Sequence, residues 1–391
     1  KKGMVMNMNN KNWVSVWGNA VSIAEHHPEA YAKYITLRYP VYIPFDGDTL
    51  RFTFDNFCGS EAVTVTRATV SAATSPVYEK MPLACPCKKE TICDITFSKN
   101  ESVTMEAHQT AVSDPVSFPV KKGMTLTVSL YFADFTLMQS AVLVTGPLSK
   151  GFFSLGDQTH ADALPMDTTK TTNWFYFLSN IELMTAEENH TVICYGDSIT
   201  AGAWPDYLTL LARQNPDNHT AFIRRATSGS RVLRQYECIT YDSYGLKGTN
   251  RFPHEIPTTG ADTVIIQQGI NDIIHPVGIE TNPFRPMSDL PTVKELIDGY
   301  RYYIEEAKKL HLKVYMGTLL PIFGWRTYAT FRDDLRNELN AWIRSAKEID
   351  GCIDFDLALR GSKNPSAFRE GFDSGDHLHP SSKAYKAMAE C

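Results

Sequence analysis

The strongest constraint on the fold is a change in the periodicity of apolar residues near residue 188. Before this point, apolar and polar residues alternate in short runs rich in Thr, Val, Tyr and Phe, separated by turn formers such as Asp46-Gly47-Asp48. Period-two alternation of this kind is typical of antiparallel strands. The first half is therefore predicted to be an antiparallel β-sandwich. The runs are Tyr34–Tyr39, Thr49–Phe54, Val63–Thr66 and Thr125–Phe132.

After this point, short apolar runs alternate with longer amphipathic stretches. Continuously apolar strands are buried on both faces, as in a parallel sheet covered by helices. Leu296, Tyr300, Ile304 and Ala307 share one face of a predicted helix. We therefore predict a doubly wound α/β domain, with domains at 1–188 and 189–391. The predicted strands are Val192–Tyr195, Ala221–Ile223, Thr263–Ile266 and Val314–Met316.

Composition narrows the class of partner. With 391 residues, 43% hydrophobic and 21% charged, the chain is long enough for two folded domains, and its formal net charge of -6 argues against nucleic acid. No apolar run is long enough to span a bilayer, so we expect no membrane partner. The start, Lys1-Lys2-Gly3-Met4, is not a signal core, which predicts a cytoplasmic protein, or a secreted one if a leader was removed.

A single local cysteine cluster bears on metal binding. Cys85, Cys87 and Cys93 contain no CxxC pair and have no adjacent His, so we assign no metal.

Polar residues follow the predicted parallel strands, which is where ligands bind in folds of this class. A Ser at a strand end can face substrate, a Gly lets a backbone N–H approach an oxyanion, and a side-chain amide donates a further hydrogen bond. Together these residue types could supply a nucleophile and two oxyanion donors. The blocks that contain them are Gly196–Thr200, Thr227–Arg231, Gly269–Asp272 and Asp376–Pro380.

The last block contains a candidate for the base that a serine nucleophile needs. Asp376 and His379 are three residues apart, so in a helical turn the carboxylate can hold one ring nitrogen while the other faces Ser198. His377 competes for the role, but neighbouring residues do not face each other in a turn. Each block alone also fits an ordinary turn, so the hydrolase interpretation depends on all four in order.

The four blocks resemble the signature of the SGNH, or GDSL-type, hydrolase superfamily. The matching segments are Gly196-Asp197-Ser198, Gly229, Gly269–Asp272 and Asp376–His379. The resemblance implies that Ser198 is the nucleophile, His379 the general base and Asp376 its orienting partner. It also implies that the Ser198 backbone N–H, Gly229 and Asn271 form the oxyanion hole, and that no cofactor is needed.

The resemblance implies a three-layer α/β/α fold with a five-stranded parallel sheet over roughly 189–391. Nearly the whole chain is also similar to a bacterial subgroup of these esterases that carries an N-terminal, jelly-roll-like β-sandwich. The segments that carry this similarity are Trp13–Trp17, Leu50–Asn56, Ser113–Val116, Trp174–Leu178 and Tyr300–Thr318.

The chain departs from the family pattern in two places. Block two has Arg224-Arg225-Ala226-Thr227 where the family has Asn and Gly, so we expect different hydrogen bonding around Gly229. The long segments Cys238–Thr259 and Pro276–Pro291 are expected to roof the pocket.

The resulting functional prediction is a carboxylic ester hydrolase that works through an acyl-enzyme. The resemblance favours an acetyl esterase acting on acetylated oligo- or polysaccharides, and the sequence shows no apolar lid for long-chain lipids. Aromatic residues in loops near the carboxyl edge of the sheet suit sugar rings, although ordinary packing explains them equally well. These residues are Trp204, Phe323, Trp325 and Tyr328.

Three alternatives to this function stay open: a short-chain lipase or acylhydrolase, an acyltransferase with the same triad, and a carbohydrate-binding protein with an idle hydrolase domain. The expected partner is a small-molecule or saccharide ester. Homo-oligomer formation, and the choice between a sugar-binding and a structural role for the first half, are also left open.

Overall fold

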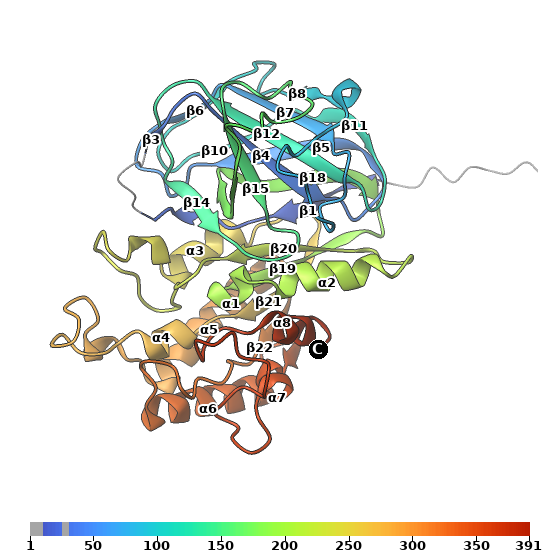
Figure 1. Cartoon of the computed structure of the whole chain (residues 1–391). Helices are drawn as coiled ribbons and strands as arrows, with labels where there is room; N and C mark the ends of the chain where they lie inside the picture. Colours follow the sequence, from blue (N-terminus) through green and yellow to red (C-terminus); the bar gives the residue numbers. More distant parts are fainter. Residues whose placement is uncertain (1–10, 26–30) are drawn as a thin grey trace, which may run out of the picture.

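The computed structural model describes residues 11–25 and 31–391. Figure 1 shows a β-rich half (blue to green) lying against one side of an α/β half (yellow to red). Strand β18 of the first half ends at Ala186, and β19, the first strand of the parallel sheet, begins at His190. The chain therefore passes between the two halves through a short turn.

The β-rich half contains two antiparallel sheets that enclose one core. One sheet has the order β1-β18-β5-β10, with β11 also paired to β5, and the other has the order β16-β15-β4-β12-β7-β8. The strands of the first sheet are β1 (Lys11–Gly18), β18 (Leu178–Ala186), β5 (Gly47–Asp55), β10 (Thr110–Val112) and β11 (Val116–Val120). Those of the second are β16 (Lys170–Thr172), β15 (Gly151–Leu155), β4 (Ile35–Tyr42), β12 (Thr125–Phe132), β7 (Arg67–Ala72) and β8 (Cys93–Ile95).

Short strands complete this half. They form the pairs β13–β3 and β6–β9 and the group β17-β14-β2. Their bounds are β2 (Ser22–Ile23), β3 (Tyr31–Ala32), β6 (Val63–Val65), β9 (Val103–Met105), β13 (Thr136–Leu137), β14 (Ser140–Leu143) and β17 (Trp174–Tyr176). The predicted antiparallel β-sandwich is confirmed.

The central strands of the second sheet are buried on both faces, which alternation alone did not predict. Every residue of β12 is buried, because loops cover the face that turns away from the core. Arg38 lies on this covered face, where its guanidinium donates to the carbonyls of Gln158 at 2.7 Å and Ala161 at 2.8 Å. Cys85 and Cys87 are buried beside it.

The α/β half has a five-stranded parallel sheet in the order β20-β19-β21-β22-β23. The first strand lies between the second and the third, so the chain reverses direction across the sheet at β19 and β21. Such a switch point opens a crevice at the carboxyl ends of the strands. The strands are β19 (His190–Gly196), β20 (Thr220–Ala226), β21 (Ala261–Gln267), β22 (Lys313–Gly317) and β23 (Gly351–Ile353).

Helices cover both faces of this sheet (Figure 1). One group contains α2, which packs on β20 and α8, and the other contains α5, which packs on β22, α3 and α6. The helices are α1 (Ser198–Ala201), α2 (Trp204–Arg213), α3 (Gly248–Glu255), α4 (Ile270–Ile274), α5 (Val293–Lys309), α6 (Thr330–Ser345), α7 (Phe355–Leu359) and α8 (Ser382–Ala389). The α/β/α architecture predicted for this half is confirmed. No helix in the described ranges is long and apolar enough to cross a membrane.

The two halves meet at the edge strand β20, against which β1 packs. The core of the β-rich half extends across this junction to Ala201, Ala221 and Ala226 of the α/β half. Polar contacts also cross it, including Thr191 Oγ1, which donates to the Ser15 carbonyl at 2.6 Å.

Candidate active site

Ser198 lies where β19 ends and the short helix α1 begins. The Asp197 carboxylate caps this turn by accepting a hydrogen bond from the backbone N–H of Ile199 at 3.1 Å. Burial raises the pKa of Asp197 to about 7. Ser198 itself is only partly buried.

A continuous chain of hydrogen bonds joins Asp376, His379 and Ser198. His379 Nε2 lies 2.9 Å from Ser198 Oγ, and His379 Nδ1 lies 2.6 Å from Asp376 Oδ2. Asp376 also accepts the backbone N–H groups of Leu378 and His379, at 2.9 and 2.8 Å, so it organises the turn that carries the imidazole.

The Asp376 carboxylate is held in its ionised form. Partial burial raises its pKa, but the hydrogen bonds from the His379 ring and from the backbone N–H groups outweigh this and lower the pKa of Asp376 to about 2. An ionised carboxylate on Nδ1 favours the tautomer in which Nε2 can accept a proton from Ser198.

His377, the competing candidate, has a carboxylate of its own. Its Nδ1 is hydrogen-bonded to Asp373 Oδ2, four residues earlier, and its backbone has a φ of +66°. Among the described residues, the only imidazole hydrogen-bonded to Ser198 is that of His379.

Gly229 lies in the loop after β20 with a φ of +78°. A Cβ at this position would lie 2.4 Å from the Tyr244 ring. Both the backbone conformation and the space therefore require glycine here. The loop is tied to block one, because Thr227 N donates to the Gly196 carbonyl at 3.1 Å.

Ser230 joins blocks two and three. Its carbonyl accepts a hydrogen bond from Asn271 Nδ2 at 3.1 Å, and its hydroxyl receives one from Gln268 Nε2 at 2.9 Å. Arg251 Nη1 also donates to the Ser230 hydroxyl, at 2.8 Å. The structure thus brings Asn271 against the loop that carries Gly229.

The Asp272 carboxylate also fixes the loop that carries Gly229. It accepts the backbone N–H groups of Val232 at 2.8 Å and Leu233 at 3.0 Å. Burial raises the pKa of Asp272 to about 6 although these two hydrogen bonds lower it.

Residues 194–387 match the model of the GDSL-like Lipase/Acylhydrolase family. These residues, just under half of the chain, form a domain of this family. The α/β half is accordingly an ester hydrolase domain, which we call the GDSL domain. No significant match was found among curated proteins.

Two solved structures similar to the GDSL domain come from bacteria. One is a GDSL-like lipase from Bacteroides thetaiotaomicron, with 20% identity and a TM-score of 0.38; the match covers 52% of this chain and 85% of that one. The other is a variant of an acetyl xylan esterase from Geobacillus stearothermophilus, with 18% identity and a TM-score of 0.39, covering 52% of this chain and 93% of that one.

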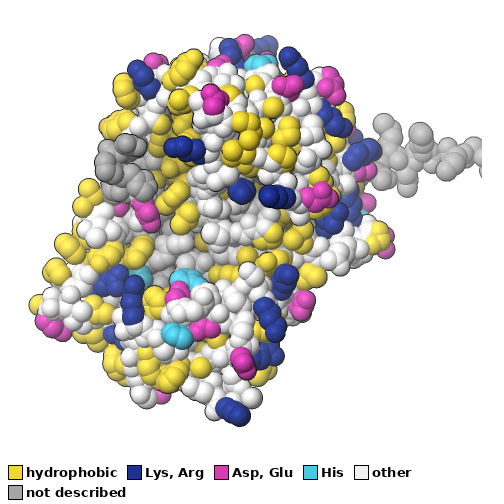
Figure 2. Space-filling model, viewed as in Figure 1, with side chains coloured by type: hydrophobic (Ala, Val, Ile, Leu, Met, Phe, Trp, Pro, Cys, Tyr) yellow, Lys and Arg dark blue, Asp and Glu magenta, His cyan; other side chains and the backbone are white. Residues whose placement is uncertain are grey.

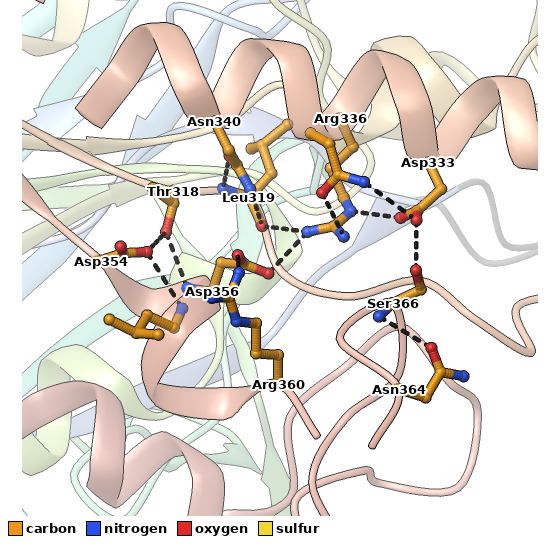
Figure 3. Close-up of polar contacts among 12 residues, drawn as sticks. Thr318, Leu319, Asp333, Arg336, Asn340, Asp354, Asp356, Arg360, Asn364 and Ser366 are labelled. Atoms are coloured by element: carbon orange, nitrogen blue, oxygen red, sulfur yellow. Dashed lines mark hydrogen bonds and ion pairs between the residues drawn. The ribbon is translucent and has the colours of Figure 1, made fainter. Parts of the chain in front are cut away.

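A buried polar network in the GDSL domain supports a loop next to the His379 block (Figure 3). Arg336 bridges Asp333 and Asp356, each at 2.8 Å, and Asp333 accepts the Ser366 hydroxyl at 2.6 Å. The Ser366 carbonyl in turn accepts the backbone N–H of Phe323 at 2.8 Å.

The next residue in that loop, Gly324, lies against the ring of His377. A Cβ on Gly324 would lie 2.8 Å from the ring, and the φ of Gly324 is +94°. Figure 2 shows His and acidic side chains gathered on the face of the GDSL domain below the β-rich half.

The aromatic residues expected to line the pocket have different surroundings. Trp204 is a core residue: it is 1% exposed and packs with Phe355 at a centroid distance of 5.6 Å. Its predicted place in a pocket loop is wrong, because Trp204 begins α2 and the first turn of that helix is buried. Phe323 is exposed and contacts Tyr328 edge to face at 5.1 Å. Trp325 is partly buried.

Sequence reasoning missed the residues that hold the loops of the GDSL domain in place. These are Ser230, Arg251, Gln268 and Asp272. Ser230 and Asp272 lie inside the second and third sequence blocks, where only Gly229 and Asn271 were given a role. For Arg251 the local signal was its i,i+4 spacing from Glu255, with which it forms a buried ion pair at 2.9 Å.

Proposed function

We propose that this chain is a serine esterase in which Ser198, His379 and Asp376 form the catalytic triad. The observation that carries the proposal is the unbroken chain from Asp376 Oδ2 through the His379 ring to Ser198 Oγ, at 2.6 and 2.9 Å. A serine hydroxyl becomes a nucleophile when an oriented imidazole can take its proton.

The reaction proceeds in two steps. Ser198 Oγ attacks the ester carbonyl while His379 Nε2 takes the hydroxyl proton, and the same nitrogen then protonates the leaving alcohol. A water molecule, deprotonated by His379, hydrolyses the acyl-enzyme and restores Ser198.

The oxyanion of each tetrahedral intermediate is stabilised by the backbone N–H groups of Ser198 and Gly229 and by the Asn271 amide. The left-handed backbone at Gly229 and the ties through Ser230 support this role, because donors held in place before reaction need no reorganisation.

The proposed substrate is a short acyl ester, with acetylated saccharides as the preferred class. Phe323 is exposed and precedes Gly324, the residue that lies against the His377 ring. An exposed aromatic ring suits the face of a sugar. Phe323 and Tyr328, which contact each other, support this proposal. Trp204 does not, because it is buried in the core.

A variant and a substrate panel test the proposal. Ser198→Ala is expected to lower kcat on 4-nitrophenyl acetate by about 10³-fold or more, with an unchanged thermal unfolding midpoint. Full turnover by the folded variant would disprove the assignment.

Release of acetate from acetylated xylan, mannan and pectin fragments supports the saccharide class, whereas activity on long acyl chains alone excludes it. Product analysis with an added acceptor alcohol separates hydrolysis from acyl transfer.

The β-rich half is proposed to have a structural role. The residues Ser22 and Val142 of this half line a small cavity together with Thr227, Ser228 and Tyr244, which surround Gly229. The β-rich half thus supports the loop that carries the proposed oxyanion donor.

A further inference from the structure

A group of aromatic and arginine side chains lies beside the loop of Gly229. We call it the arginine–tyrosine cluster, and its members are Arg231, Tyr236, Tyr241, Tyr244, His275 and Arg285. The Tyr236 ring centroid lies 4.8 Å from that of Tyr241 and 5.8 Å from that of His275. The Arg231 guanidinium lies 4.2 Å from the Tyr236 ring, and that of Arg285 lies 4.7 Å from the Tyr241 ring. The six side chains therefore form one continuous group.

This cluster contacts both proposed oxyanion segments. The Tyr244 ring fills the space next to Gly229, where a Cβ would be 2.4 Å away. Tyr244 also lies 5.2 Å from His275, whose backbone N–H donates to the Asn271 carbonyl at 3.2 Å. The cluster thus adjoins the two segments that would hold the ester oxyanion.

Arg285 is the unusual member. It is 8% exposed, its Nε is buried without a hydrogen-bond partner, and among the described residues no acidic side chain forms an ion pair with it. Other buried arginines of the GDSL domain pair with a carboxylate, as Arg251 does with Glu255, or donate to backbone carbonyls, as Arg332 does to those of Ile273 and Pro276. A guanidinium that is largely buried and has no counter-charge points to an anionic ligand.

Further hydrogen-bonding atoms next to Arg285 also lack protein partners in the described part of the chain. They are Tyr236 Oη, His275 Nδ1 and Arg231 Nε. Asp289, which pairs with one member of the cluster, is engaged by Arg231 at 3.2 Å and by Arg234 at 3.7 Å. Burial and the neighbouring arginines lower the pKa of His275 well below its ordinary value, so its ring is neutral at pH 7.

We propose that the arginine–tyrosine cluster binds a carboxylate of the substrate, with Arg285 as the principal contact, so that the preferred ester is an anionic one. A guanidinium can donate two parallel hydrogen bonds to a carboxylate, and the phenol of Tyr236 can donate a third. This inference rests on the proposed function and narrows its substrate class from short acyl esters in general to esters that carry a carboxylate.

Matched substrate pairs test the inference on the unaltered protein. Mono-O-acetyl glucuronic acid is compared with mono-O-acetyl glucuronamide for a carboxylate on the alcohol side. The 4-nitrophenyl monoester of adipic acid is compared with its monoamide for a carboxylate on the acyl side. We expect kcat/KM for the acid to exceed that for the amide at least about tenfold in one of the two pairs.

Variants then assign the preference to Arg285. Arg285→Gln is expected to reduce the acid-to-amide ratio of kcat/KM about tenfold or more, and Arg285→Lys to retain part of it, because the charge remains but the two-pronged hydrogen bonding is lost. The matched control is Arg301→Gln, an exposed arginine on α5, which should leave the ratio unchanged.

The outcomes of these experiments test the carboxylate subsite separately from the proposed esterase activity. Absence of Ser198-dependent hydrolysis of 4-nitrophenyl acetate refutes the proposed function itself. Hydrolysis of that ester with acid-to-amide ratios near one in both pairs overturns the carboxylate subsite and leaves the esterase proposal standing. If Arg285→Gln does not fold, the acid-to-amide ratios of kcat/KM of the unaltered protein still show whether a carboxylate on the substrate is preferred.

Discussion

His377 and His379 show at the scale of single residues how identical side chains two positions apart acquire different surroundings. Each has its own carboxylate on Nδ1, Asp373 for His377 and Asp376 for His379. Only His379 also contacts Ser198 Oγ. The spacing Asp376–His379 pointed to this pair from the sequence, but the second Asp–His pair was not anticipated, since its two members look unrelated without the turn that joins them.

The two Asp–His pairs allow a matched test of orientation. Asp376→Asn is expected to lower kcat on 4-nitrophenyl acetate by about 10²–10⁴-fold, because the amide can hold the wrong imidazole tautomer and cannot stabilise the imidazolium. Asp373→Asn removes the same charge beside the other histidine and is expected to change kcat less than about fivefold. Steady-state kinetics on both variants measures this. Equal losses would contradict the assignment of His379.

Asp197 gives a prediction about pH. Its pKa is raised in the folded protein, so the folded state binds the proton more tightly than the unfolded one, and stability falls as pH rises from about 4 to about 7. Asp197→Asn keeps an acceptor for the Ile199 N–H but cannot ionise. We expect the variant to gain on the order of 2 kcal/mol relative to the native chain between pH 4 and pH 7.

Urea unfolding at several pH values measures this difference. The pKa of Asp272 is also raised, so both carboxyl groups contribute to the pH dependence of the native chain. The effect of Asp197 is therefore read from the difference in unfolding free energy between the native chain and Asp197→Asn. A difference that does not change with pH would show that Asp197 is ionised equally in both states.

At the scale of secondary-structure elements, β20 explains the departure of block two from the family pattern. Arg225 donates from Nη1 to the carbonyls of Asn19 at 2.6 Å and Ser179 at 2.8 Å in the β-rich half. Arg224 pairs with Asp206 at 2.8 Å and also donates to Ser149 Oγ at 2.8 Å. The two arginines join the halves on opposite faces of one strand.

Replacing Arg225 tests this junction. Burial lowers the pKa of Arg225 to about 10, so the side chain stays charged at neutral pH and depends on its carbonyl partners. Arg225→Met leaves those carbonyls buried without a donor, and we expect a loss of about 2–4 kcal/mol in the free energy of unfolding.

Denaturant unfolding measures the loss. Arg301→Gln, on the exposed face of α5, is the control and should change stability by less than about 0.5 kcal/mol. A similarly small effect at Arg225 would show that its hydrogen bonds do not hold the halves together.

At the scale of the whole molecule, the core does not stop at the predicted boundary. Ala201, Ala221 and Ala226 belong to the core of the β-rich half although they lie in the GDSL domain. Division into domains at 1–188 and 189–391 stays a prediction. Because the core is shared, each half buries apolar residues of the other.

Truncation tests this dependence. Residues 189–391 produced alone would expose the face of β20 that β1 covers, so we expect aggregation or a thermal midpoint lowered by 10 °C or more, roughly what a loss of several kcal/mol implies. The full chain, purified identically, is the control and should unfold in one transition by calorimetry. A soluble, fully active 189–391 would refute the structural role of the β-rich half.

The sequence alone determined the order of the two architectures and pointed to the residues of the proposed triad. Both depend on local properties: apolar periodicity sets strand and helix type, and Ser198, Asp376 and His379 lie in short blocks of distinctive composition. Residues whose roles come from distant partners could not be predicted. Arg225 spans two halves, Ser230 joins two loops, and Arg285 lacks a counter-charge. Only the tertiary structure decides the roles of these three residues, because pairing and burial arise when segments far apart in the chain pack together.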